Sequence, residues 1–334
     1  MKYHDDVVDV VIDVRDGGDW SLDLCFAGLV NNLGPGRIID VPAKDKHREW
    51  GIGENSWGKE RRTLGYTSLN HLIDNKLNGR GICRVWLDER MESFYKYREL
   101  LYDRLKVNVV VVAGHDRFWN HSPKFVADLY GENFEAMLLD NWYDEYSKLP
   151  FKARRIGWST NFNHYWNRPI TTSAKDIDIS FMGYNSHQDR FRYVEHISKK
   201  WSHLNNHIVL ETRPDTTESF IAKAQYFDIM QRSKICLNLR GAADRGKTMR
   251  AYEIPYVGSF MLSQRIDDPG MHSDFINQTH CLYFNNENEL DTAIDWALNN
   301  EAARENIAML GHKKAIGQLS VKERWKDVLQ WLDK

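Results

Sequence analysis

Runs of apolar, β-branched residues alternate along the chain with segments in which apolar residues recur at helical spacing. In the first half, such runs predict strands over residues 7–14, 37–41, 81–87, 107–113, 134–140 and 154–159. A helical pattern over residues 21–34 follows the first run and stops at Gly34 and Pro35. Strands that alternate with helices indicate α/β units around a mostly parallel sheet.

The second half repeats the alternation after a segment that is typical of a linker. Residues 167–175, NRPITTSAK, lose apolar periodicity and gain Pro, Thr and Ser. Strands are predicted beyond this segment over residues 177–182, 207–213, 234–240, 259–262 and 281–286. Helices are predicted over residues 190–199, 218–233 and 287–300, and a long helical tail follows them.

The length of 334 residues favours two domains, because single hydrophobic cores rarely grow beyond about 250–300 residues. We predict a first domain over residues 1–168 and a second over residues 169–320. We expect the helix over residues 321–334 to pack back toward the first domain.

Charge and composition exclude several classes of protein. The 45 Lys and Arg residues nearly balance the 47 Asp and Glu residues, which disfavours a polycation built for nucleic acid. No apolar run is long enough to span a bilayer and the first residues lack a signal-peptide pattern, so we expect a soluble, cytoplasmic protein. No zinc-type spacing is present, so we predict no metal site and four reduced core cysteines: Cys25, Cys83, Cys236 and Cys281.

One segment matches the phosphate-loop pattern of nucleotide hydrolases. Gly241, Gly246, Lys247 and Thr248 have the required spacing, and a predicted strand precedes them. Such a loop needs an uninterrupted helix after the lysine to aim backbone amides at phosphates, and Pro255 follows closely. An ATP-hydrolysing enzyme is therefore an alternative and not the favoured interpretation.

The order of motifs in the second half resembles the CgeB-like, spore-maturation branch of the glycosyltransferases. The resemblance covers about residues 150–332 and rests on four segments in order: DISFMGYNSHQDRFRYVEHI, SKICLNLR, RAYEIPYVGSFMLS and ENELDTAIDWAL. It implies the GT-B fold, an α/β architecture of two facing Rossmann-like domains with mostly parallel sheets. It also implies transfer of a hexosyl or pentosyl group from a nucleotide diphosphate sugar, with uridine the expected base, to an acceptor hydroxyl.

The resemblance assigns Glu253 to the ribose hydroxyls of the donor, and the surrounding residue types suit that ligand. A carboxylate accepts hydrogen bonds from vicinal hydroxyls, while cations and helix N-termini suit a diphosphate. Gly183 ends the first strand of the second domain, where a side chain would obstruct a ligand. The candidate donor-binding cations are Arg190, Arg213, Arg240, Arg245, Lys247 and Arg250. They would stabilise the leaving diphosphate without an obligatory metal.

The chain departs from the pattern of related retaining enzymes at one position. Those enzymes carry two glutamates eight positions apart, and the position eight before Glu253 is Arg245, with Asp244 beside it. The sugar and the retaining or inverting outcome therefore stay open. A sugar-nucleotide or glycan-binding protein without turnover is a second alternative.

Two loops of the first domain carry the candidate catalytic groups. Asp16, with Gly17 and Gly18, follows the first strand, where it could act as general base or lie in a tight turn. His115 and Asp116 follow the strongly apolar strand over residues 107–113 and form the other candidate. Trp158 is a further acceptor-side candidate. The acceptor stays open among a glycan, a protein, a small molecule and a hydroxymethylated DNA base, the last disfavoured by the charge balance.

Overall fold

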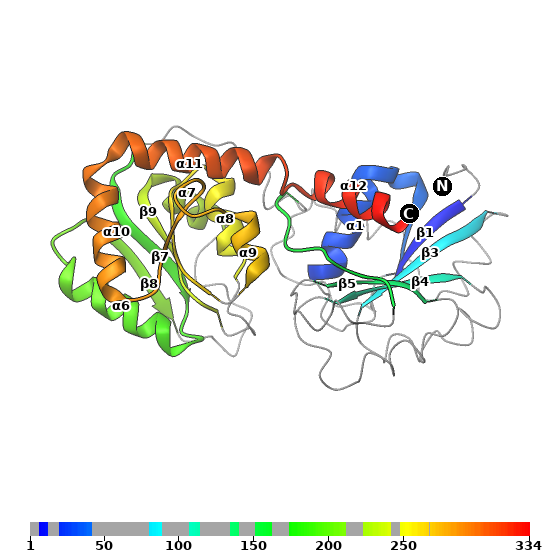
Figure 1. Ribbon diagram of the computed structural model, residues 1–334, viewed down its shortest axis with the longest axis horizontal. Helices are drawn as coiled ribbons and strands as arrows, with labels where there is room; N and C mark the ends of the chain where they lie inside the picture. The colour runs from blue at the N-terminus through cyan, green and yellow to red at the C-terminus, as the bar shows by residue number, and fades with distance from the viewer. Residues whose placement is uncertain are drawn as a thin grey trace. The chain divides into compact units, whose positions relative to one another are not determined.

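The computed structural model of the protein contains two compact units (Figure 1). The first comprises Met1–Tyr165 with Ser320–Lys334, and the second comprises Trp166–Leu319. The predicted boundaries lay at residues 168 and 320. The structure describes residues 7–12, 20–41, 80–88, 107–113, 134–139, 151–161, 174–211, 223–241, 248–266 and 268–334.

The first unit is built on a six-stranded sheet in the order β2-β1-β3-β4-β5-β6, and every pairing between these strands is parallel. Strands β1 and β4 are apolar at every position but one, as is typical of a parallel sheet that is covered on both faces. The strands are β1 Val7–Ile12, β2 Ile38–Val41, β3 Gly81–Asp88, β4 Asn108–Ala113, β5 Phe134–Leu139 and β6 Ala153–Arg155. Helix α1, Trp20–Leu33, and the short helix η1, Pro35–Arg37, lie between β1 and β2.

The last helix of the chain, α12 (Val321–Leu332), packs on α1 within the first unit. Trp325 of α12 is fully buried, with its ring centroid 5.6 Å from that of Trp86 in β3. Gly28 of α1 lies directly beneath the Trp325 indole, where an added Cβ would be 2.0 Å from Trp325 Cγ. A glycine on α1 therefore makes room for a tryptophan of α12.

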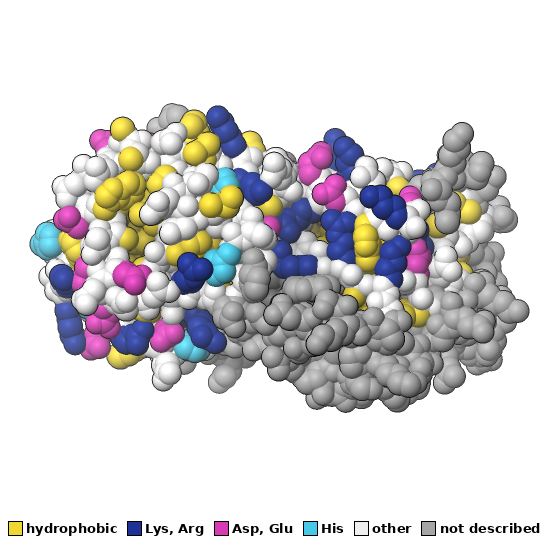
Figure 2. All heavy atoms as spheres, in the orientation of Figure 1, with side chains coloured by type: hydrophobic (Ala, Val, Ile, Leu, Met, Phe, Trp, Pro, Cys, Tyr) yellow, Lys and Arg dark blue, Asp and Glu magenta, His cyan; other side chains and the backbone are white. Residues whose placement is uncertain are grey.

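Cations of the first unit bind main-chain carbonyls of α12. Figure 2 shows Lys and Arg side chains gathered on the face of the first unit where α12 lies. Lys152 Nζ donates to the Leu332 carbonyl oxygen at 3.1 Å, and Arg154 Nη1 donates to the Asp327 carbonyl oxygen at 2.6 Å. Cations at a helix C-terminus also interact favourably with the helix dipole. These bonds fasten the second half of α12 to β6 and to the residue before β6.

We expect Gly28→Ala to lower the free energy of unfolding by about 1–3 kcal/mol, because the new methyl group overpacks the contact with Trp325. Urea denaturation measures the effect. Gly36→Ala is the matched control, since an added Cβ at Gly36 meets nothing within 4 Å. Equal stability of both variants would show that α1 and α12 are not in close contact.

The second unit has a five-stranded parallel sheet in the order β11-β10-β9-β7-β8. Its strands are β7 Ile177–Tyr184, β8 Asn206–Glu211, β9 Ser233–Asn238, β10 Met261–Gln264 and β11 Leu282–Phe284. Its helices are α6 Gln188–Lys200, α7 Lys223–Arg232, α8 Arg250–Tyr256, α9 Pro269–Asp274, α10 Glu287–Asn299 and α11 Glu301–Ile316. Among the described helices of the whole chain, none has the length and apolar character that a bilayer crossing requires.

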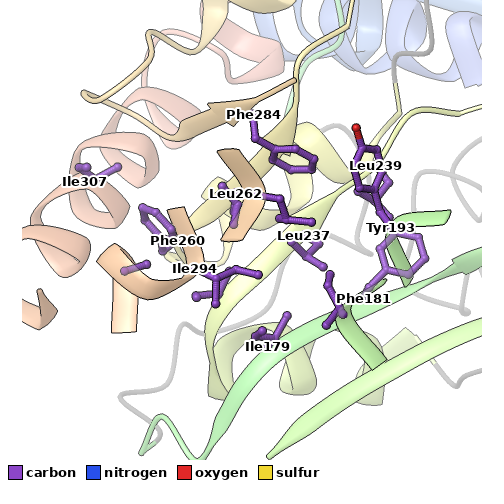
Figure 3. Packing of buried hydrophobic residues seen from close by; sticks show 14 of the residues in the cluster. Ile179, Phe181, Tyr193, Leu237, Leu239, Phe260, Leu262, Phe284, Ile294 and Ile307 are labelled. Carbon is purple, nitrogen blue, oxygen red and sulfur yellow. The ribbon is translucent and has the colours of Figure 1, made fainter. Parts of the chain in front are cut away.

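The core of the second unit lies between one face of this sheet and helices α6, α10 and α11. Figure 3 shows Phe181, Leu237 and Leu262, from three neighbouring strands, in one cluster with Ile294 of α10. Tyr193 of α6 stacks edge-on against Phe284, with ring centroids 5.1 Å apart. This packed layer fixes the strands whose carboxyl ends are described below.

The long helical tail consists of two helices, α11 and α12, and α12 is the helix predicted over residues 321–334. Gly317 follows α11, and Ser320 caps α12 by accepting a 3.4 Å hydrogen bond from the Glu323 amide. A serine three residues before a glutamate is the pattern of a capping box. That pattern is present in the sequence and marks the break, which apolar periodicity alone does not show.

The prediction that all four cysteines are core residues is wrong for Cys83. Cys25, Cys236 and Cys281 are buried, whereas Cys83 is half-buried. The pairing of β1 with β3 shifts at this point, since Val8 pairs with Ile82 and Asp9 pairs with Arg84. Cys83 is thus the extra residue of a β-bulge, and a bulge locally disrupts the ladder.

Candidate functional site

The carboxyl ends of β7, β9 and β10 lie at one edge of the second sheet, beside the starts of α6 and α8. Ligands of open parallel sheets bind at this edge. The structure brings together five of the predicted donor-binding residues there: Gly183, Arg190, Arg240, Arg250 and Glu253. The other three, Arg213, Arg245 and Lys247, lie outside the described residues.

Arg190 of α6 is buried and directs its guanidinium to main-chain oxygens at the strand ends. Nη1 donates to the Tyr184 carbonyl at 2.8 Å, and Nε donates to the Arg240 carbonyl at 2.6 Å. Burial, together with the nearby charge of Arg250, lowers the pKa of Arg190 to about 9. Arg190 thus fastens the end of β7 to the end of β9, which favours a positioning role over direct contact with a ligand.

Arg250, the first residue of α8, reaches across the end of β7. Its Nη2 donates to the Met182 carbonyl oxygen, and its Cζ lies 4.8 Å from the centre of the Phe181 ring. Arg250 is 8% exposed, and its Nε and Nη1 are buried without a well-formed hydrogen bond in the described part of the chain, where the Tyr226 side chain is the polar group beside the guanidinium. A buried cation with two unpaired nitrogens is costly unless an anion satisfies it.

The structure explains the need for glycine at position 183 differently from the sequence prediction. An added Cβ at Gly183 would lie 2.8 Å from Arg250 Nη2 and 3.1 Å from Phe181 Cζ. The space that a side chain would occupy is therefore taken by the Arg250 guanidinium. The glycine makes room for the cation at this edge of the sheet.

Glu253 lies in the first turn of α8 and is buried at 6% exposure. The Tyr226 hydroxyl of α7 donates to Glu253 Oε2 at 2.7 Å. Burial and the adjacent Glu253 carboxylate raise the pKa of Tyr226 well above its usual value, against a smaller opposing effect of Arg250. The tyrosine therefore stays protonated and holds the carboxylate one turn from Arg250.

Sequence reasoning missed a set of buried or half-buried polar side chains around the same edge: Tyr226, Asn238, Thr248, Ser263 and Gln264. All five take part in side-chain hydrogen bonds there. Asn238, Ser263 and Gln264 come at the carboxyl ends of apolar strands. A polar residue that ends an apolar run is the sequence signal that could have identified them.

The predicted residues of the first domain are largely outside the described part of the chain. Asp16, Gly17, Gly18, His115 and Asp116 all fall there. Trp158 is described and is 7% exposed within the first unit. Burial of its ring favours a packing role.

Two aspartates at the opposite, amino-terminal end of β7 pair with cations. Arg232 donates two hydrogen bonds to the Asp176 carboxylate, at 2.5 and 2.9 Å, and the pKa of Asp176 is lowered chiefly for that reason. Lys234 Nζ donates to Asp178 at 2.7 Å. Within the described residues, no three His, Cys, Asp or Glu side chains gather as a metal site would require.

Two Rossmann-like units, each with a parallel sheet flanked by helices, define the GT-B class of glycosyltransferases, and this class is borne out by comparison with solved structures. Residues 164–330, half of the chain, match the family described as glycosyl transferase-like. The chain therefore belongs to the glycosyl transferase-like family. The predicted α/β, GT-B fold is confirmed, and so is the membership of a glycosyltransferase family.

Three solved structures illustrate the likeness of fold. HepE from Anabaena, crystallised with UDP and glucose, matches with a TM-score of 0.60 and 8% identity over 98% of this chain and 99% of that one. A glycosyltransferase from Rickettsia africae matches with a TM-score of 0.60 and 11% identity, over 98% and 97%. Sucrose-phosphate synthase from Thermosynechococcus elongatus matches with a TM-score of 0.56 and 13% identity, over 97% and 98%. A comparison with curated proteins finds no significant match.

Proposed function

We propose that the protein transfers a hexosyl or pentosyl group from a UDP-sugar to an acceptor hydroxyl, and that the second unit binds the donor. One observation carries the proposal: Arg250 is buried at the carboxyl end of β7 with two unpaired nitrogens, one helical turn from the buried carboxylate of Glu253. A nucleoside diphosphate presents an anion and a pair of ribose hydroxyls, which match a cation and a carboxylate in that order.

In this proposal the diphosphate supplies the partner that the Arg250 guanidinium lacks. Arg240, whose Nε is also buried without a partner in the described residues, lies at the end of β9 and is the second cation. Arg245 and Lys247 lie between these two arginines in the sequence. Stabilisation of the leaving diphosphate by such cations lowers the barrier to sugar transfer, and we propose that no metal is obligatory for it. The UDP-bound crystals of HepE support the choice of donor.

We propose the CgeB-like branch as the closer relationship, on the ordered motifs between residues 150 and 332. The acceptor that we propose is a hydroxyl of a glycan, a protein or a small molecule. A hydroxymethylated DNA base would require a local excess of Lys and Arg, which the overall charge of −2 does not favour.

A thermal-shift panel tests the proposed donor. We expect UDP and UDP-sugars to raise the melting temperature in EDTA, because a ligand at 100 times its Kd stabilises the native state by about 2.7 kcal/mol. ATP with magnesium serves as the comparison ligand. If ATP with magnesium raises the melting temperature and UDP and UDP-sugars do not, the sugar-nucleotide site is rejected in favour of a phosphate-loop hydrolase.

The structure offers little support for that alternative. The helix that follows the glycine-rich segment is α8, which has seven residues and contains Pro255. A non-catalytic binding protein is distinguished by its kinetics, since it would bind the donor and release no UDP with any acceptor or with water.

We expect Glu253→Gln to weaken UDP binding by about 1.5–3 kcal/mol, the worth of hydrogen bonds to a charged group. Isothermal titration calorimetry measures the change. Glu195→Gln is the control, because Glu195 is exposed on α6 and pairs only with Lys199 among the described contacts. Equal affinity of the Glu253 variant and the wild type would make Glu253 a structural partner of Tyr226.

A further inference from the structure

The main chain of Arg240 is held on both sides by buried side chains. Its amide donates to Gln264 Oε1 at 3.0 Å, and its carbonyl accepts from Arg190 Nε at 2.6 Å. Gln264 Nε2 in turn donates to Asp189 Oδ2 at 2.9 Å. Because a carboxylate only accepts, Asp189 fixes the Gln264 amide with its oxygen toward Arg240.

A second set of bonds holds Thr248, two positions before α8. The Thr248 hydroxyl donates to Asn238 Oδ1 at 2.7 Å, and Asn238 Nδ2 donates to Ser263 Oγ at 2.9 Å. The Ser263 hydroxyl donates to the Gln264 carbonyl oxygen at 3.1 Å, so its oxygen is left to accept from Asn238. The direction of each bond thus sets the next, and the Asn238 amide oxygen must face Thr248.

Both sets of bonds end on adjacent residues of one strand. Ser263 and Gln264 are the last two residues of β10, and side chains alternate between the faces of a strand. One face of β10 therefore holds Thr248 through Asn238, and the other holds Arg240. The anchored residues flank, in sequence, the segment that contains Arg245 and Lys247, and Thr248 lies just before Arg250.

We propose that Asn238 is a positioning residue for donor binding, which holds Thr248 and the start of α8 in place before the nucleotide arrives. The inference rests on the proposed function. Cations that are already fixed lose little conformational freedom on binding, so the donor gains affinity. Asn238 does not contact the ligand in this proposal and acts through its bond with Thr248.

A purely structural role would give the same hydrogen bonds, so the test needs variants that separate stability from affinity. Thr248→Val removes the hydroxyl with little change in shape, and Thr248→Ser keeps the hydroxyl. Ser233→Ala is the matched control: Ser233 is fully buried at the other end of β9, and its hydroxyl donates to the Ile229 carbonyl at 2.6 Å. The measurements are the Kd of UDP by calorimetry, the melting temperature, and amide hydrogen exchange over residues 248–253.

We expect Thr248→Val to raise the Kd of UDP about 3- to 10-fold, the effect of one lost hydrogen bond, and to speed amide exchange at the start of α8. Thr248→Ser should restore both values. Ser233→Ala should lower the melting temperature and leave both values unchanged.

Two results would overturn the inference in different ways. If the wild type binds UDP and Thr248→Val binds it equally well, the proposed positioning role is wrong while the proposed function stands. If the wild type binds no UDP, the proposed function is wrong, and this inference, which rests on it, is wrong as well.

Discussion

His115→Ala is expected to lower kcat by about 10²- to 10⁴-fold while the Kd of UDP stays unchanged, since removal of a general base typically has an effect of that size. His115 follows β4, which lies between β3 and β5 in the first sheet, by two positions. Loops at the carboxyl ends of parallel strands carry the functional groups of such domains. A group that acts on the acceptor contributes in the transition state and little to ground-state donor binding.

Single-turnover and steady-state rates with an identified acceptor measure this effect. Asp16→Asn is the parallel variant, because Asp16 follows β1 and is the other candidate base. His203→Ala, at an exposed position of the second unit, is the control. Full turnover by both the His115 and Asp16 variants would show that the catalytic base is another residue.

Arg250→Met is expected to raise the Kd of UDP by about 100-fold or more. The two unpaired nitrogens of Arg250 can each donate to the diphosphate, and a hydrogen bond to a charged group is worth about 1.5–3 kcal/mol. The variant should be as stable as the wild type without ligand, or more stable, because it removes a buried charge that lacks an anionic partner. Calorimetry and chemical denaturation on the same samples measure both properties.

The combination of lost affinity and retained stability is what distinguishes a ligand-binding arginine from a structural one. Arg250→Lys should not restore affinity, since an ammonium group cannot present two fixed, parallel donors. A variant that unfolds readily but binds UDP with wild-type affinity would mean that Arg250 serves only to hold β7 through the Met182 carbonyl.

Much of the fold could be predicted from the sequence because buried parallel strands are continuous apolar runs. The run predicted at residues 177–182 is β7, Ile177–Tyr184, and the run predicted at residues 134–140 is β5, Phe134–Leu139. The apolar run alone identifies such a strand, without knowledge of the strands that pair with it. Short elements were harder: the strand predicted over residues 154–159 is only Ala153–Arg155, and α9 was not predicted.

The contacts of the site could not be predicted, because they join residues far apart in the chain. Arg190 meets the Arg240 carbonyl 50 positions away, and Tyr226 meets Glu253 27 positions away. The residue types at the strand ends indicated a diphosphate site, whereas only the fold shows that Arg250 occupies the space above Gly183. Sequence patterns can thus identify candidate charged residues, but they do not distinguish a cation that binds the ligand from one that holds the main chain.

A crystal structure of the protein with UDP is the most direct test of the proposed donor site. We predict diphosphate oxygens within hydrogen-bond distance, about 2.7–3.2 Å, of Arg250 Nε or Nη1, and ribose hydroxyls on the Glu253 carboxylate. UDP bound with its diphosphate away from Arg250 and its ribose on other residues would contradict the assignment of this edge of the second sheet as the donor site.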